Sequence, residues 1–254
     1  MRLTLLGSGD ARQVPVYNCA CAACDSARVY PQRRRGPCCA LIECGEQRWL
    51  IDSGLTDLTE RFAPHSLSGI LQTHYHADHA QGLLQLRWGQ GLVIPVHGPD
   101  DPEGLADLYK HPGILDFSRP FAALERRDLG ELSVTALPLN HSRPTFGYLF
   151  EQRETRGEGR RIAYLTDTLG VPEPSCAVLR QLPLDVLVLD CSTAPQAQAP
   201  RNHNDLTRAL EVIERLAPRQ AVLTHIGHSF DAWLLEHSEA LPPGVSLAFD
   251  GRVL

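Results

Sequence analysis

Residues 69–79 read GILQTHYHADH, a short apolar run that ends abruptly in a histidine-rich segment. The apolar half is typical of a buried strand, and the polar half places His74, His76, Asp78 and His79 within six positions. Imidazole nitrogens and a carboxylate oxygen are ligands that suit zinc, manganese or iron. A solvated polar turn is the alternative, but this density of ligands favours a transition-metal site.

The spacing within this segment predicts two neighbouring metals. An extended His-x-His presents His74 and His76 on the same side of the chain, because side chains alternate along a strand. Asp78 and His79 begin a turn or helix, so their side chains point elsewhere. We also expect Asp78 to take part in catalysis.

Three more candidate ligands follow apolar runs: His141 after LSVTALPLN, Asp167 after RRIAYLT and His225 after QAVLT. Each alone would more often be a structural polar residue. With the first segment they provide five histidines and two aspartates, which is enough for two metals if Asp167 bridges them. The predicted ligand sets are His74, His76 and His141 for one metal, and Asp78, His79 and His225 for the other.

Polar residues that support the site are also predicted at strand ends. Asp52 ends QRWLID and Asp190 ends LDVLVLD, and we expect both to hold ligands or their loops; a turn or cap is the alternative. His203, in APRNHNDL, is the candidate general acid, because histidine titrates in the right range. Its alternative is a surface histidine at the start of a helix.

The N-terminal region contains a second candidate metal site. Cys19, Cys21 and Cys24 form C-x-C-x2-C, and zinc usually takes a fourth ligand, for which His228 is the candidate. Reduced surface thiols or a redox-active trio are the alternatives. The remaining cysteines lie in apolar or isolated positions and are expected to be buried small side chains. These are Cys38, Cys39, Cys44, Cys176 and Cys191.

Composition and charge limit the class of protein. With 254 residues, 43% hydrophobic and 21% charged, the chain fits one globular domain spanning residues 1–254. A net charge of −6 disfavours non-specific nucleic-acid binding. We see neither a secretory signal nor an apolar run of about 20 residues. We therefore expect a cytoplasmic protein that binds neither membranes nor nucleic acid.

Strand and helix patterns alternate along the chain, which indicates a layered α/β fold. DLTRALEVIERLA, from residue 205 to 217, has helical spacing, with Asn202 or Asn204 as the expected cap. RETRGEGRR, from residue 153 to 161, is interpreted as an exposed loop.

The segments LIDSG, HYHADH, LNHS, LTDT and THIGH occur in this order. Their sequence and placement resemble the five motifs of the metallo-β-lactamase superfamily. The resemblance implies an αββα sandwich, two mixed β-sheets flanked by helices, with the metals at one edge of the sheets.

Longer stretches narrow the resemblance, among them GSGDARQVPVYNCACAAC, LPLNHSRPTFGYL, APRNHNDL and LTHIGHSFDAWL. They are similar to the PhnP family of cyclic phosphodiesterases of the carbon–phosphorus lyase pathway. The resemblance implies hydrolysis of a small anionic sugar cyclic phosphate, 5-phosphoribosyl 1,2-cyclic phosphate, to ribose 1,5-bisphosphate in phosphonate catabolism. It also implies two catalytic Mn²⁺ (Zn²⁺ is the alternative), one structural Zn²⁺ and a homodimer. Lys110 and His111 are considered as contacts to the distal phosphate.

Three alternatives stay open at this point. A transfer-RNA 3′-processing nuclease shares the catalytic motifs, but the acidic balance argues against it. A thioester or lactam hydrolase would explain neither the cysteine cluster nor His203. A non-catalytic, metal-bearing accessory protein of the pyrroloquinoline quinone biosynthesis type also has an N-terminal cysteine trio, but that alternative predicts missing catalytic ligands.

Overall fold

The computed structural model describes residues 1–152, 159–198 and 201–254. Residues 153–158, most of the segment interpreted as an arginine-rich loop, lie outside the described residues, as do 199–200. In the part of the chain that is described, no helix is long and apolar enough to cross a membrane.

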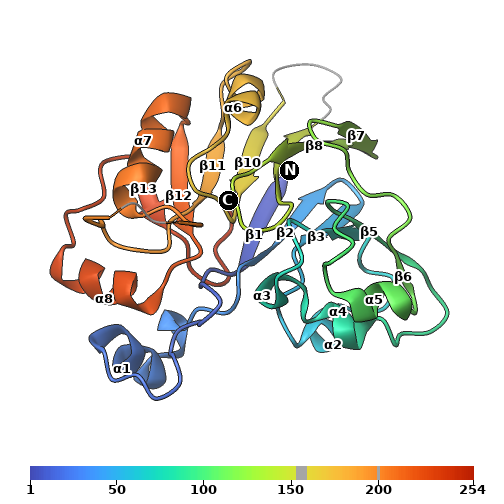
Figure 1. The fold of residues 1–254 in the computed structure, drawn as a ribbon, viewed down its shortest axis with the longest axis horizontal. Coiled ribbons are helices and arrows are strands. Elements are labelled where there is room, and N and C mark those ends of the chain that lie inside the picture. The colour runs from blue at the N-terminus through green and yellow to red at the C-terminus, as the bar shows by residue number, and fades with distance from the viewer. Residues whose placement is uncertain (153–158, 199–200) are drawn as a thin grey trace.

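Two mixed β-sheets form the centre of the molecule (Figure 1). The first runs in the order β1-β2-β3-β4-β5-β6, antiparallel up to β3 and parallel from β3 onward. The second runs in the order β13-β12-β11-β10-β9-β8-β7, parallel from β13 to β10 and antiparallel from β10 to β7. The first-sheet strands are β1 (Arg2–Gly7), β2 (Cys39–Cys44), β3 (Gln47–Ile51), β4 (Gly69–Leu71), β5 (Ile94–His97) and β6 (Leu115–Asp116). The second-sheet strands are β7 (Arg126–Leu129), β8 (Leu132–Pro138), β9 (Phe146–Gln152), β10 (Arg161–Leu165), β11 (Val186–Asp190), β12 (Gln220–Thr224) and β13 (Val245–Leu247).

Helices cover the outer face of each sheet, which gives the predicted αββα layers (Figure 1). One core lies between the sheets and joins, for example, Ile42 of β2 to Tyr148 of β9. A second core lies between the second sheet and its helices, and a third between the first sheet and its helices. The helices are α1 (Ala22–Val29), η1 (Pro31–Arg33), α2 (Leu58–Arg61), α3 (Ala77–Ala80), α4 (Leu83–Leu86), α5 (Ala106–Lys110), α6 (Glu173–Leu179), α7 (Leu206–Leu216) and α8 (His228–Glu236).

The parallel parts of both sheets deliver polar residues to a common edge. Strands β10 and β11 are buried along their whole length, as expected for parallel strands covered on both faces. The carboxyl ends of parallel strands point the same way, so the residues that follow them meet at one edge. Asp52 and His74 follow β3 and β4 in the first sheet, and Asp167 and His225 follow β10 and β12 in the second.

The predicted cap of helix α7 is wrong. The N-cap is Asp205, whose carboxylate accepts a hydrogen bond from the backbone N–H of Arg208 at 2.9 Å. Asn204 is buried and has another role, since its side chain donates to the Asp190 carbonyl and accepts from the backbone N–H of Gly170. Its amide therefore links the end of β11 to the loop that follows β10.

Candidate metal centres and active site

Three imidazole nitrogens converge at the edge of the sheets. Nε2 of His74 and Nε2 of His141 lie 2.9 and 3.1 Å from Nδ1 of His76. Nitrogens that bind one zinc ion at 2.0–2.1 Å are themselves separated by about 3.0–3.4 Å, depending on the coordination geometry. Burial lowers the pKa of each of these histidines, which favours the neutral form that a metal requires. The geometry and the protonation therefore both fit a metal ion.

A second cluster lies beside the first and shares Asp167 with it. Nε2 of His79 lies 3.3 Å from carboxylate oxygens of both Asp78 and Asp167, and Nε2 of His225 lies 3.4 Å from Asp167. The two Nε2 atoms are buried and have no hydrogen-bond partner among the described residues. Since buried polar atoms are rarely left unpaired, they point to a metal. Asp167 also lies 3.7 Å from Nε2 of His74, so its carboxylate can bridge two ions.

The other ring nitrogen of the second-cluster histidines is held by a hydrogen bond. Nδ1–H of His79 donates to Asp52 at 2.7 Å. Nδ1–H of His225 donates to the Ser192 hydroxyl at 2.8 Å, and that hydroxyl donates to Asp190. These bonds leave each Nε2 with the lone pair that a metal takes.

In the first cluster, the second ring nitrogen of His74 and of His141 is likewise held by a hydrogen bond. Nδ1–H of His74 donates to the Thr73 hydroxyl at 3.0 Å, and the hydroxyl donates to Asp52. Nδ1–H of His141 donates to the backbone carbonyl of Asn202 at 3.2 Å. Asp52 thus serves both clusters, in the supporting role that the sequence suggested for it.

Carboxylates make the second cluster strongly attractive to cations. Burial alone would lower the pKa of His79, but the negative charges of Asp167 and Asp52 raise it well above its usual value. The same opposition of burial and Asp167 raises the pKa of His225. The carboxylates that favour protonation of His79 and His225 would equally attract a bound cation, which would take the place of those protons.

His203 lies over the two clusters. Its ring stacks on His225 with centroids 4.7 Å apart and lies 5.2 Å from that of His141. Nδ1–H donates to Asp190 at 2.8 Å. Burial would lower the pKa of His203, but the charge and hydrogen bond of Asp190 raise it to about 9. The imidazole is therefore protonated at neutral pH, partly exposed and placed beside the predicted ligands.

The N-terminal cysteines meet His228 as the spacing suggested. Nδ1 of His228 lies 3.4, 3.5 and 3.7 Å from the sulfurs of Cys19, Cys21 and Cys24. Tetrahedral zinc, with Zn–S of 2.3 Å and Zn–N of 2.0–2.1 Å, separates nitrogen from sulfur by about 3.6 Å. A backbone hydrogen bond from Cys21 lowers the pKa of Cys19, which favours a thiolate, whereas burial raises the pKa of Cys24 to about 11. The four side chains therefore fit a structural zinc site.

Comparison with known proteins identifies the fold family. The model of the beta-lactamase superfamily domain matches residues 41–226, well over half of the chain. The chain belongs to the metallo-β-lactamase superfamily.

Individual relatives of this metallo-β-lactamase-fold chain have several activities. The crystal structure of a diphosphatase from the PhnP family is 28% identical with a TM-score of 0.80, covering 100% of this chain and 96% of that one. A ribonuclease Z of Acaryochloris marina is 26% identical over 83% of this chain and 85% of that protein. An octanoyltransferase of Porphyromonas gingivalis is 27% identical over 99% of this chain, which spans only 51% of that protein. The PhnP resemblance is thereby supported, and divalent metal binding agrees with the superfamily and with the ligand clusters.

The structure brings every predicted ligand into a cluster. The groups that contain them are His74, His76, His141 and Asp167; Asp78, His79, Asp167 and His225; and Cys19, Cys21, Cys24 and His228. A fourth group, Asp167, Asp190, His203 and His225, overlaps the second. The sequence reasoning missed the polar residues that fix the tautomers, namely Thr73, Ser192 and Asn202. Thr73 directly precedes His74, and that adjacency was the available signal, whereas Ser192 and Asn202 are far in sequence from the histidines that they hold.

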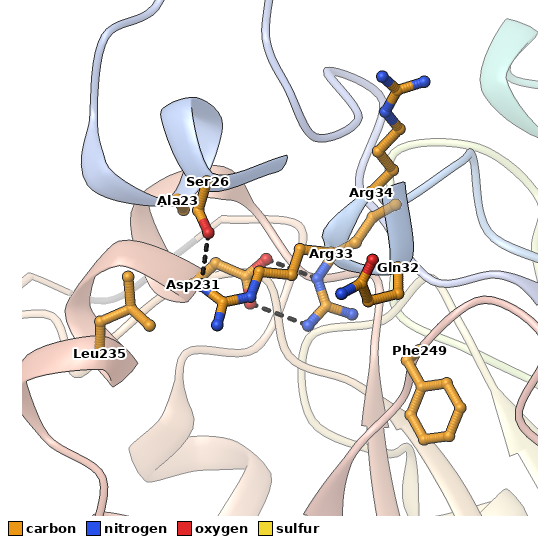
Figure 2. A pocket seen from close by; sticks show the side chains of 9 residues that line it. Ala23, Ser26, Gln32, Arg33, Arg34, Asp231, Leu235 and Phe249 are labelled. Carbon is orange, nitrogen blue, oxygen red and sulfur yellow. Dashed lines mark hydrogen bonds and ion pairs between the residues drawn. The ribbon is translucent and has the colours of Figure 1, made fainter. Parts of the chain in front are cut away.

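A largely buried ion pair attaches helix α8, which begins at His228, to the body of the chain. Arg35 forms two hydrogen bonds to Asp231 of α8, at 2.6 and 2.8 Å, and one to the Ala248 carbonyl. Figure 2 shows the pocket at this junction, where Ser26 of α1 receives a hydrogen bond from Arg33. The pocket has a volume of about 300 Å³. Because His228 begins α8, the zinc site and the α1–α8 junction form one unit next to His225.

We expect three transition-metal ions per chain in gently purified protein, one for each cluster of predicted ligands; the two catalytic clusters share Asp167. Elemental analysis measures this directly, with two ions in the catalytic pair and one zinc at the cysteines. A reproducible value of one ion in fully active protein would contradict the two-metal site.

Cys21→Ser should weaken catalytic metal binding although Cys21 contacts no catalytic ligand. His225 and His228 lie on one short loop, and groups that support a ligand typically change metal affinity or activity by about 10–100-fold. Activity titrated against manganese should shift to higher concentration, with partial recovery at saturation. Cys44→Ser, a buried cysteine of β2 outside the zinc cluster, is the control. Superimposable curves for wild type and a zinc-free Cys21→Ser protein would exclude the coupling.

Proposed function

We propose that the chain is a metal-dependent phosphodiesterase that hydrolyses 5-phosphoribosyl 1,2-cyclic phosphate to ribose 1,5-bisphosphate in phosphonate catabolism. The observation that carries the proposal is the position of His203, which Asp190 holds through Nδ1 at 2.8 Å beside a complete two-metal ligand set. The resemblance to the PhnP family supports the substrate class. We also propose that the protein is cytoplasmic and forms a homodimer.

The ligand sets suit two different kinds of metal. Histidine and carboxylate ligands fit manganese or zinc at the pair, whereas Cys19, Cys21, Cys24 and His228 fit structural zinc. Two metals in such a pair supply a nucleophile from water near neutral pH and neutralise phosphoryl oxygens. The chain itself contributes the fixed tautomers of its histidines.

His203 is proposed to donate the proton that the leaving oxygen needs. A sugar alkoxide is a poor leaving group, so opening a cyclic diester benefits from general acid catalysis. Asp190 holds the ring through Nδ1–H, which leaves Nε2–H of the imidazolium available to the substrate. The exposed fraction of the side chain, 31%, gives that proton access to the site.

The same site chemistry would also serve a phosphoanhydride, because a diphosphatase is among the PhnP-family neighbours. His203 distinguishes the two reactions, since a phosphate leaving group needs less protonation than an alkoxide. The accessory-protein alternative predicts missing ligands, and all seven residues of the catalytic pair are in place. The net charge of −6 disfavours a transfer-RNA substrate.

Incubation with manganese and 5-phosphoribosyl 1,2-cyclic phosphate should yield ribose 1,5-bisphosphate, identified by phosphorus NMR. A nucleoside diphosphate and a transfer-RNA precursor, supplied to the same preparation, should turn over much more slowly. Faster hydrolysis of the diphosphate would assign the chain to diphosphatases, and no turnover of bis-p-nitrophenyl phosphate would favour the accessory protein.

His203→Ala should reduce turnover of the sugar cyclic phosphate by about 10²–10⁴-fold, the usual contribution of a general acid. The loss should be small for bis-p-nitrophenyl phosphate, because p-nitrophenolate leaves without a proton. His237→Ala, at an exposed histidine at the end of α8, is the control. Equal losses on both substrates would show that His203 only shapes the site.

A further inference from the structure

We propose that Arg143 binds the distal phosphate of the substrate and so selects sugar cyclic phosphates that carry a second, non-reacting phosphate. This inference rests on the proposed function and extends it to specificity. Its basis is an ion pair at the sheet edge, between Arg143 and the buried carboxylate of Asp101, which have Nη1 and Oδ2 atoms 3.2 Å apart.

The ion pair lies on the same edge as the metal ligands. Asp52 follows β3, His74 follows β4, and Asp101 lies in the loop that follows β5, the next parallel strand. Adjacent strands are roughly 5 Å apart. Arg143 is therefore displaced sideways from the metal pair along the edge, where a group remote from the reacting phosphate would lie.

Both partners are attached to the metal-binding segment. The loop of Arg143 also carries His141, and the backbone N–H of Phe146, where that loop ends, donates to the Thr73 carbonyl at 2.9 Å. The loop of Asp101 packs on Tyr75, since a Cβ built on Gly104 would lie 3.1 Å from the Tyr75 side chain. The guanidinium is thus held in a fixed relation to His74 and His76.

Asp101 orients the Arg143 guanidinium through one contact and leaves most of its N–H donors available. Asp101 is 3% exposed, and its other oxygen accepts from the backbone N–H of Glu103. Arginine has five N–H donors, and the single contact to Asp101 leaves most of them free. The Arg143 side chain is 31% exposed, so these donors can reach a ligand. An ordered arginine can bind a phosphate with two parallel hydrogen bonds.

Two other cations, Arg201 and Lys110, lack this preparation. Arg201 lies two residues before His203 and is exposed, with no hydrogen bond or ion pair to the residues that the structure describes. Lys110, at the end of α5, is exposed as well. Ordering such a long side chain on binding costs conformational entropy. The Asp101 contact has already ordered Arg143, which favours it over both.

The test compares Arg143→Gln with Arg201→Gln on two substrates, 5-phosphoribosyl 1,2-cyclic phosphate and the same ribosyl compound without the 5-phosphate. We expect Arg143→Gln to raise KM for the phosphorylated substrate by about 10–100-fold, the usual effect of losing hydrogen bonds to a charged group. The kcat, and both constants for the shorter substrate, should change less than about threefold. Arg143→Lys should restore part of the affinity, and Arg201→Gln should resemble wild type.

Calorimetric binding of ribose 5-phosphate gives a readout independent of turnover, and should weaken in Arg143→Gln alone. A preparation that binds ribose 5-phosphate through Arg143 but hydrolyses neither cyclic phosphate would overturn the proposed reaction and keep the phosphate contact. Equal losses on both substrates, or a selective loss in Arg201→Gln instead, would overturn the role of Arg143. A wild type that does not discriminate between the substrates would overturn it too.

Discussion

The buried carboxylate of Asp52 accepts hydrogen bonds from the Thr73 backbone and hydroxyl and from His79. Through these contacts it decides which nitrogen of His79 carries a proton and, by way of Thr73, which nitrogen of His74 does. Burial raises the pKa of Asp52, and the donors around it oppose that rise. One charge therefore orients a ligand of each predicted metal, and the rest of the site is arranged around it.

The second sheet repeats this arrangement with Asp190. Its carboxylate accepts hydrogen bonds from the Ser192 hydroxyl, from Nδ1–H of His203 and from the backbone N–H of Thr168. Asp190 thus orients the ligand His225 through the Ser192 hydroxyl, and it orients the candidate acid His203 directly. The two parallel sheet edges each contribute one buried aspartate that holds histidines and one set of residues that faces the metals. This duplication explains how ligands for two metal ions can be held where the sheets meet.

Sequence patterns were enough for the ligands and for the supporting aspartates Asp52 and Asp190, but not for the hydroxyl and carbonyl groups that hold the other histidine nitrogens. Ligand residues follow apolar strands, and parallel strands must end at one edge, so the amino-acid sequence alone connects His141, Asp167 and His225 to the first motif. Ser192 and Asn202 gave no comparable signal, because hydroxyls and backbone carbonyls near a strand end are common. The prediction of the α7 N-cap was wrong for a related reason. Asn204 and Asp205 are both good N-cap residues, and only the hydrogen bond of Asn204 to Asp190 decides between them.

The loop from His225 to His228 shows how the two metal centres depend on each other. His225 has a φ of 60°, a left-handed conformation that costs a non-glycine residue about 1–3 kcal/mol. The backbone N–H of Ile226 donates to the Ser8 carbonyl, and the backbone N–H of Asp10 donates to the Ile226 carbonyl, so the N-terminal segment fastens one side of the loop. His228 fastens the other side to the cysteines of the same N-terminal segment. Structural zinc binds with about 10–16 kcal/mol in small peptides, far more than the strain at His225. A zinc ion held there can therefore stabilise the conformation of this loop that aims Nε2 of His225 at Asp167.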